Sequence, residues 1–108
     1  MTVKELSEAL NAVVICMPDG DREVSGGYAG DLLSWVMGRA RSGDAWVTIM
    51  SKVNIVAVAT LADPSCIVLS EGVTLEKEVV ARANDVGVNV ISSPLDTFTL
   101  CSKISSLI

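Results

Sequence analysis

The sequence contains no histidine. This absence excludes Ser-His-Asp and Cys-His nucleophile systems, and it removes the usual proton carrier near neutral pH and the commonest metal ligand. A small enzyme could still combine Lys52 or Arg22 with carboxylates, but few groups then remain for acid–base catalysis. No GxxxxGK[ST] or GxGxxG segment marks a nucleotide-binding loop. We therefore expect a non-catalytic protein without a cofactor.

Cysteine is also scarce. Cys16, Cys66 and Cys101 are odd in number and form no CxxC pair, which argues against a disulfide scaffold and against a zinc site. Cys16 and Cys66 lie within apolar runs and are expected to be small buried hydrophobes in a reducing cytosol. A turn with Asp19, Asp21 and Glu23 could be imagined to hold a divalent ion, but its spacing does not match an EF-hand loop. We predict no metal site.

Positive charge is sparse. Eight basic residues stand against thirteen acidic ones, for a net charge of −5, and only Arg39 and Arg41 lie close together. Nucleic-acid binding needs clustered Lys and Arg. The longest uncharged apolar run, residues 53–62, is shorter than the roughly 20 residues of a membrane span, and the N-terminus lacks the apolar core of a signal peptide. We expect a cytoplasmic protein that binds neither nucleic acid nor membranes.

Aliphatic residues are abundant. Half of the 108 residues are apolar and only four are aromatic. This length suits one domain, residues 1–108. A core of β-branched and other aliphatic side chains is typical of parallel sheets covered by helices.

The periodicity of apolar residues predicts alternating strands and helices. Strands are expected near residues 12–17, 24–29, 45–50, 66–69 and 88–91, and helices near 3–10, 32–40, 54–61, 74–83 and from 97 to the end. Expected helix caps are Thr2 with Glu5, Asp31, and Asp96 or Thr97, and Asn54 is expected to cap or lie near the start of its helix. Residues 55–59 could also form a strand, but the strands on either side need a crossover helix between them. The alternation predicts an α/β fold with a mostly parallel sheet and helices on both faces.

Small polar residues follow the last three predicted strands. Ligands of open parallel sheets bind beyond the carboxyl ends of the strands, where helix N-termini attract anions. The candidate ligand-binding residues there are Ser51, Lys52, Asn54, Ser70, Gly72, Ser92, Ser93 and Thr97. The alternative is that these residues are ordinary helix caps.

Residues 21–34 form the most distinctive segment. Gly26 and Gly27 permit close approaches that a side chain forbids, and Asp21 and Arg22 can fix the preceding turn by local hydrogen bonds. A glycine-kinked strand before a capped helix explains much of this segment without a ligand. Ser25, Gly26 and Gly27 nevertheless join the candidate ligand-binding residues.

The same segment resembles the DRTGG domain, which is named for an Asp-Arg-x-x-Thr-Gly-Gly pattern. Asp21, Arg22, Gly26 and Gly27 match this pattern, and Ser25 replaces Thr and keeps the hydroxyl. Residues 46–49, 54–56 and 92–98 are similar to that family too. In the family, the domain occurs in the N-terminal region of HPr kinase/phosphorylase enzymes and between CBS domains of some inorganic pyrophosphatases. The resemblance implies a fold like that of the HPr kinase and Mur ligase N-terminal domains, and a regulatory or assembly role.

These observations predict a regulatory module that senses a small anionic ligand (a phosphate, nucleotide or metabolite) or docks on a partner enzyme. We also predict a homodimer, because so small and apolar a domain can leave an exposed patch. Tyr28, Trp35 and Trp46 are either interface anchors or core residues. The alternative function is a purely structural adaptor, which flat, dry loop ends after the last three predicted strands would favour, whereas a concave polar cleft would favour sensing.

Overall fold

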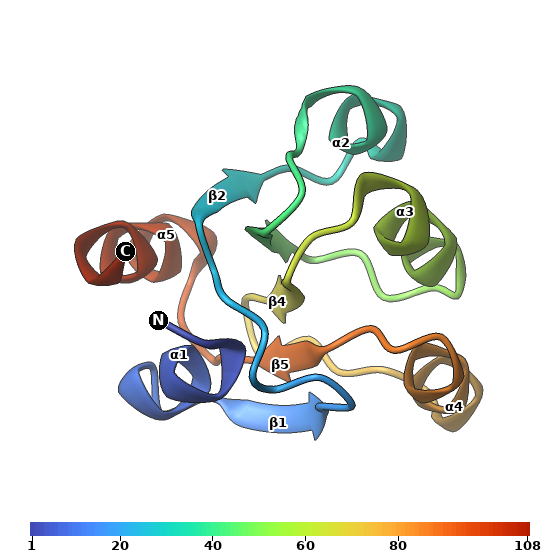
Figure 1. The fold of residues 1–108 in the computed structure, drawn as a ribbon, viewed down its shortest axis with the longest axis horizontal. Helices are drawn as coiled ribbons and strands as arrows, with labels where there is room; N and C mark the ends of the chain where they lie inside the picture. The colour runs from blue at the N-terminus through green and yellow to red at the C-terminus, as the bar shows by residue number, and fades with distance from the viewer.

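Two consecutive strands, β1 (Val13–Cys16) and β2 (Gly26–Ala29), lie at opposite edges of one five-stranded sheet (Figure 1). The computed structural model describes residues 1–108. Its elements in chain order are α1 (Val3–Ala9), β1 (Val13–Cys16), β2 (Gly26–Ala29), α2 (Leu33–Arg39), β3 (Asp44–Thr48), α3 (Asn54–Ala62), β4 (Cys66–Leu69), α4 (Lys77–Asp85), β5 (Val90–Ser92) and α5 (Thr97–Leu107). The strand order is β1-β5-β4-β3-β2. Strands β2 to β5 are parallel and β1 is antiparallel to β5, which confirms the predicted mostly parallel α/β sheet.

Helices cover both faces of the sheet, as predicted, and each face has its own core. Strand β3 shows how alternation builds the two cores, because Trp46 packs with one cluster and its neighbours Ala45 and Val47 pack with the other. Helices α2, α3 and α4 cover the Trp46 side, and α1 and α5 cover the opposite side. None of the helices combines the length and apolar character needed to cross a bilayer.

Helix starts follow the predicted caps in two cases. Thr2 and Glu5 form the expected capping box of α1. The Asp96 carboxylate accepts a hydrogen bond from Thr99 N and caps α5. The predicted Asp31 cap is wrong: α2 begins after Leu32 without a side-chain cap. Asp31 instead accepts hydrogen bonds from Thr48 Oγ1 (2.8 Å) and Ile49 N (3.0 Å), so it joins the ends of β2 and β3.

Helix α4 begins three residues later than expected. The predicted start at Thr74 is wrong, because α4 begins at Lys77 with Glu76 as its N-cap. The preceding loop is held against β5, since Ser92 Oγ donates a hydrogen bond to the Val73 carbonyl (2.6 Å). Residues 73–76 are not helical.

Helix α5 packs on the sheet through Leu100 and Ile104, which are buried, and Cys101 packs beside them. Phe98 in the first turn of α5 is apolar, but it is 84% exposed.

Residues 17–25 cross from β1 to β2 over the amino ends of the other strands (Figure 1). This crossing segment is held by the residues that precede β5, β4 and β3 in turn. Asn89 bonds both main-chain groups of Asp19. The Ser65 hydroxyl donates to the Glu23 carbonyl, and Ser25 N donates to the Gly43 carbonyl. The sequence left the position of the first two strands open, and these contacts fix it.

Candidate functional site

The candidate residues from the sequence fall at opposite ends of the sheet. Ser25, Gly26 and Gly27 lie at the amino end of β2. The other eight candidates lie at or beyond the carboxyl ends of β3, β4 and β5. Because strands β2 to β5 are parallel, the structure does not bring the two sets together.

The loops at the carboxyl ends of β4 and β5 bond to each other. The buried Ser70 hydroxyl pairs with Thr97 Oγ1 (2.7 Å), and Gly72 N donates to the Ser93 carbonyl (2.9 Å). The Ser93 hydroxyl accepts a hydrogen bond from Leu95 N. These groups therefore hold the loops together, and none of them lines a hollow in the structure.

The remaining carboxyl-end candidates are more open. Ser51 is half-buried, and Lys52 and Asn54 are exposed. Asn54 lines a shallow groove between α3 and α4 beside Arg82, and Lys52 lines no hollow. Binding of an anion at Lys52 stays a prediction.

Arg22 of the Asp-Arg-x-x-Ser-Gly-Gly motif makes a long-range contact. Its guanidinium donates to Asp63 Oδ1 (2.9 Å) and to the Asp63 carbonyl (2.8 Å), at the left-handed residue that ends α3. The expected local hydrogen bonds to the preceding turn are therefore not the role of this side chain. Hydrogen bonds from Arg22 and from the Ser42 hydroxyl lower the pKa of Asp63. Arg22 thus attaches the crossing segment to the α3–β4 connection.

Gly26 makes room for a carboxylate. A Cβ atom at this position would lie 2.8 Å from Asp44 Oδ1, whereas a Cβ at Gly27 would meet nothing closer than 3.6 Å. The Asp44 carboxylate is buried and accepts a hydrogen bond from Arg41 N (2.8 Å) through Oδ2. The first glycine of the motif is therefore required by close packing, and the second is not.

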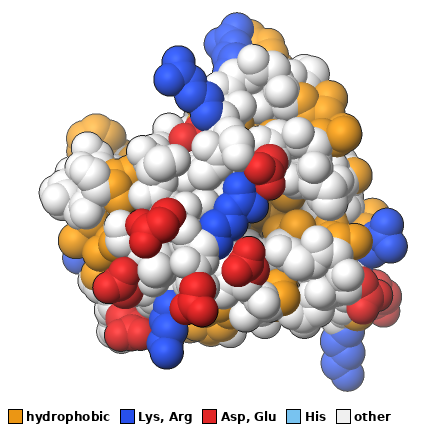
Figure 2. Space-filling model, in the orientation of Figure 1, with side chains coloured by type: hydrophobic (Ala, Val, Ile, Leu, Met, Phe, Trp, Pro, Cys, Tyr) orange, Lys and Arg blue, Asp and Glu red, His pale blue; other side chains and the backbone are white.

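A polar groove of about 360 Å³, called here the arginine groove, opens beside these glycines. Arg39 and Arg41 lie on its wall, and neither takes part in the two ion pairs of the structure, which join Met1 to Glu23 and Arg22 to Asp63. Two basic side chains project near α2 in Figure 2, and several of the acidic side chains of that face lie toward α1. The groove is lined by Ser25, Gly26, Gly27, Tyr28, Arg39, Arg41, Ser42 and Asp44.

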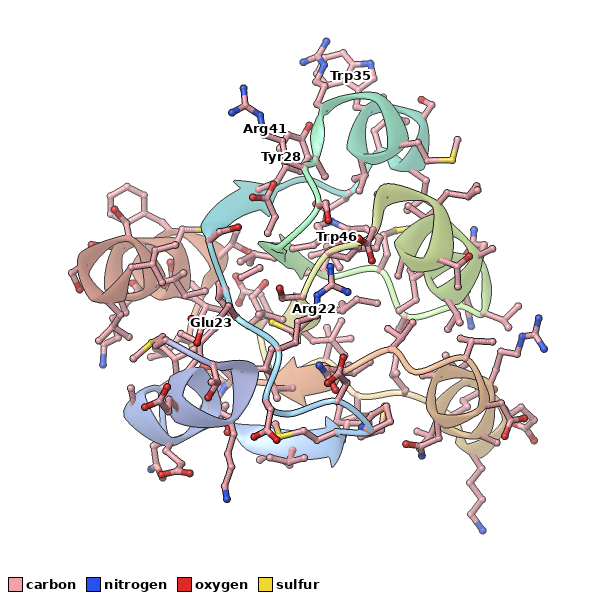
Figure 3. All side chains as sticks on the ribbon, viewed as in Figure 1. Arg22, Glu23, Tyr28, Trp35, Arg41 and Trp46 are labelled. Atoms are coloured by element: carbon pink, nitrogen blue, oxygen red, sulfur yellow. The ribbon has the colours of Figure 1, made fainter.

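A second hollow of about 550 Å³, called here the aromatic hollow, adjoins the arginine groove. Tyr28 and Arg39 line both. Trp35 is 52% exposed and carries the Arg39 guanidinium 3.8 Å from its ring centroid. Figure 3 shows Tyr28, Trp35 and Arg41 on the same corner of the molecule, around β2 and α2. The hollow is lined by Tyr28, Ala29, Gly30, Asp31, Leu32, Trp35 and Arg39.

Sequence reasoning named Ser25, Gly26 and Gly27 but missed the two arginines beside them. Arg39 and Arg41 are the one close pair of basic residues in the chain, and that spacing was the available signal. Of the three aromatic candidates for an interface, Trp46 is fully buried and belongs to the core. Trp35 is exposed and Tyr28 is half-buried.

The remaining candidate groups are cysteine thiols and the carboxylates around the turn after β1. An apolar hollow of about 310 Å³ between α5 and β2 is lined in part by Cys101. Burial raises the pKa of the Cys101 thiol and raises that of Cys66 to about 12, which disfavours the reactive thiolate. Asp19, Asp21 and Glu23 do not gather, and the structure contains no group of three side chains suited to hold a metal ion.

Comparisons with known proteins add two findings. The family model of the DRTGG domain matches residues 5–107. The fold is similar to a crystal structure of the CBS and DRTGG domains from the regulatory region of Clostridium perfringens pyrophosphatase, complexed with the activator diadenosine tetraphosphate. That match has a TM-score of 0.72 and 19% identity, and it covers 95% of this chain but 45% of the other, so this chain spans less than half of that structure. The comparison with curated proteins found no match.

Proposed function

Because the chain belongs to the DRTGG domain family, we propose that it is a non-catalytic regulatory domain that senses a small anionic ligand in the arginine groove. The observation that carries this proposal is the position of Arg39 and Arg41. Both line a concave polar groove and neither is neutralised by a carboxylate partner. Guanidinium groups bind phosphates and carboxylates in bidentate fashion, so this pair suits a compact anion.

The floor of the groove suits close approach by a ligand. Gly26 and Gly27 carry no side chains, and the hydroxyls of Ser25 and Ser42 add hydrogen-bonding groups at the rim. The Asp44 carboxylate opposes an anion, but two guanidinium charges outnumber it. A concave polar site is the feature that favours sensing over a purely structural role.

The comparisons support a regulatory role in general terms. The pyrophosphatase region with a similar fold was crystallised with an activator, so a domain of this kind occurs in a ligand-responsive region of another protein. The groove joins β2 to the α2–β3 connection. Binding across these two elements would stabilise their relative position, and a change in mobility can be transmitted to a partner enzyme. The finer likeness to HPr kinase and Mur ligase domains stays a prediction.

Calorimetric titration with inorganic pyrophosphate, tripolyphosphate and phosphorylated sugars tests the proposal. We expect binding by the wild type, a loss of at least about tenfold in Arg39→Gln/Arg41→Gln, and no change in Lys52→Gln. Loss in Lys52→Gln alone would move the site to the carboxyl ends of the strands. No binding of any of these anions to the wild type would contradict anion sensing.

A second candidate function is self-association or partner docking through β2, the adaptor role. The observation that favours it is the uncharged edge strand Gly26–Ala29, which lacks the charged residues that usually protect sheet edges. Arg41 lies in the α2–β3 connection near the amino end of β2, and Asp31 follows the carboxyl end of β2. In an antiparallel pair of two copies, Arg41 of one copy would approach Asp31 of the other. Such pairing would give the predicted homodimer, and it would cover the arginine groove.

Sedimentation distinguishes the two candidates. Gly30 N donates to Val47 O in β3, so alternation along the strand directs Ala29 N away from the sheet. Ala29→Pro would therefore remove an outward donor and leave the pairing with β3 intact. A wild-type dimer that Ala29→Pro converts to a monomer supports docking through β2. A wild type that sediments as an 11.3 kDa species at all concentrations contradicts it.

A further inference from the structure

The arginine groove and the aromatic hollow adjoin each other, and together they indicate the chemical class of the ligand. We infer that the anion is a nucleotide, with its phosphates at Arg39 and Arg41 and its base against the rings of Tyr28 and Trp35. This inference rests on the proposed function, because it names the class of ligand for the same site.

Shared lining residues make the two hollows one continuous surface. Tyr28 and Arg39 contribute to both, so a ligand that leaves the arginine groove along β2 reaches the aromatic hollow directly. Gly30 permits this arrangement, since a Cβ there would lie 3.0 Å from the Tyr28 ring. The chain therefore holds the tyrosine ring between the cationic and the aromatic ends.

The aromatic end has the chemistry of a base-stacking platform. Trp35 and Leu32 are both more than half exposed, and they flank the start of α2 in the same hollow. Every nucleobase has a flat π-face that stacks on aromatic side chains and on guanidinium planes. Arg39 already lies over the Trp35 ring, so one residue can contact both a base and a phosphate.

The carboxylate within the groove also fits a nucleotide better than a bare phosphate. Asp44 Oδ2 accepts the hydrogen bond from Arg41 N, whereas Asp44 Oδ1 lies toward Gly26 without a hydrogen-bond donor. A carboxylate oxygen that accepts no hydrogen bond within the protein repels a phosphate, but it can accept hydrogen bonds from the hydroxyls of a sugar. A ligand with phosphates, a sugar and a flat base therefore matches all three kinds of group on this surface.

The charge pattern favours a free nucleotide over a nucleic-acid strand. A strand requires a row of cations along its backbone, and this surface offers only Arg39 and Arg41 in a chain of net charge −5. Two guanidiniums match the few phosphates of one nucleotide.

The test compares adenosine triphosphate with inorganic tripolyphosphate by calorimetry, without divalent ions, and follows tryptophan fluorescence in parallel. Trp46 is fully buried, so ligand-dependent quenching reports Trp35. We expect adenosine triphosphate to bind at least about tenfold more tightly than tripolyphosphate, because stacking adds to the phosphate contacts. Trp35→Leu should remove this advantage and leave tripolyphosphate binding unchanged, and Trp35→Phe should restore most of it.

The outcomes of this test distinguish the nucleotide inference from the proposed anion-sensing function. Equal affinities for the two probes in the wild type would contradict the inference of a nucleotide but not the proposed anion site. An advantage of adenosine triphosphate that persists in Trp35→Leu would do the same. No binding of either probe would overturn both. Tyr28→Leu provides a second variant at the other ring, and it should also weaken the preference for adenosine triphosphate.

Discussion

Arg22 donates hydrogen bonds to both the carboxylate and the main-chain carbonyl of Asp63, 41 positions further along the chain. This contact attaches the segment that crosses the sheet to the end of α3. The carbonyl lies at the C-terminus of the helix, where a cation is also favoured by the helix dipole. The Arg of the family motif therefore stabilises the fold, whereas its serine and glycines line the arginine groove.

Replacing Arg22 with Met should lower the free energy of unfolding by about 1–2 kcal/mol, because two hydrogen bonds involving a charged group are lost at a partly exposed site. Asp63→Asn should cost less, since the carbonyl contact survives. A double-mutant cycle measured by urea unfolding should show coupling between the two positions. Additive effects would mean that the two side chains do not interact in solution.

The same pair predicts how stability depends on pH. Asp63 has a lowered pKa in the folded protein because Arg22 and Ser42 bond its carboxylate, and its unperturbed value is 3.8. A carboxyl with a lowered folded-state pKa contributes stability above its unfolded pKa and loses it as the pH falls through the folded value. The stability difference between wild type and Arg22→Met should therefore shrink below about pH 4. A difference that stays constant from pH 7 to pH 3 would contradict this account.

The two motif glycines should respond differently to alanine. Gly26→Ala places a Cβ against Asp44 Oδ1 and should destabilise the fold by about 1–3 kcal/mol, as overpacking does. Gly27→Ala is the matched control, because its Cβ has ordinary contact distances and the change should be close to neutral. Thermal unfolding of both variants and of the wild type measures these changes in stability. Equal destabilisation would show that the glycines are required for backbone conformation rather than for the Asp44 contact.

Neutralising the carboxylate in the arginine groove should strengthen the binding of a simple anion. Asp44→Asn removes one negative charge but keeps an oxygen that can accept the Arg41 N hydrogen bond. We expect tripolyphosphate to bind roughly three- to tenfold more tightly at low salt, with a smaller gain at high salt. Glu8→Gln removes an equal charge from α1 and should change little. An equal gain in both variants would indicate a net-charge effect without a defined site.

The sequence predicted the sheet and its covering helices because buried aliphatic runs and crossover geometry leave few alternatives. The runs around Trp46, Ile67 and Ile91 became three adjacent parallel strands. It did not predict which edge β2 occupies, because that is decided by hydrogen bonds between the crossing segment and Asn89, Ser65 and Gly43, which no local pattern encodes. The prediction that Asp31 caps α2 was wrong for a related reason, because local spacing cannot reveal a distant partner such as Thr48.

The candidate site was only partly visible in the sequence. The glycine motif indicated a close approach of backbone, and the structure places Ser25, Gly26 and Gly27 on one groove. Arg39 and Arg41 reach that groove only because β3 returns beside β2, so that Asp44 lies opposite Gly26. The carboxyl-end serines had the composition of an anion site, but their hydrogen bonds to neighbouring loops depend on the register of β4 and β5.

The most direct test is to follow the backbone amides by nuclear magnetic resonance while adenosine triphosphate is added to the ¹⁵N-labelled wild type. The amides of Gly26 and Gly27, on the floor of the arginine groove, should shift together with saturation, whereas Gly72, in the β4–α4 loop at the opposite end of the sheet, should not. Saturable shifts at Gly72 and Lys52, with Gly26 and Gly27 unmoved, would contradict the arginine groove as the ligand site.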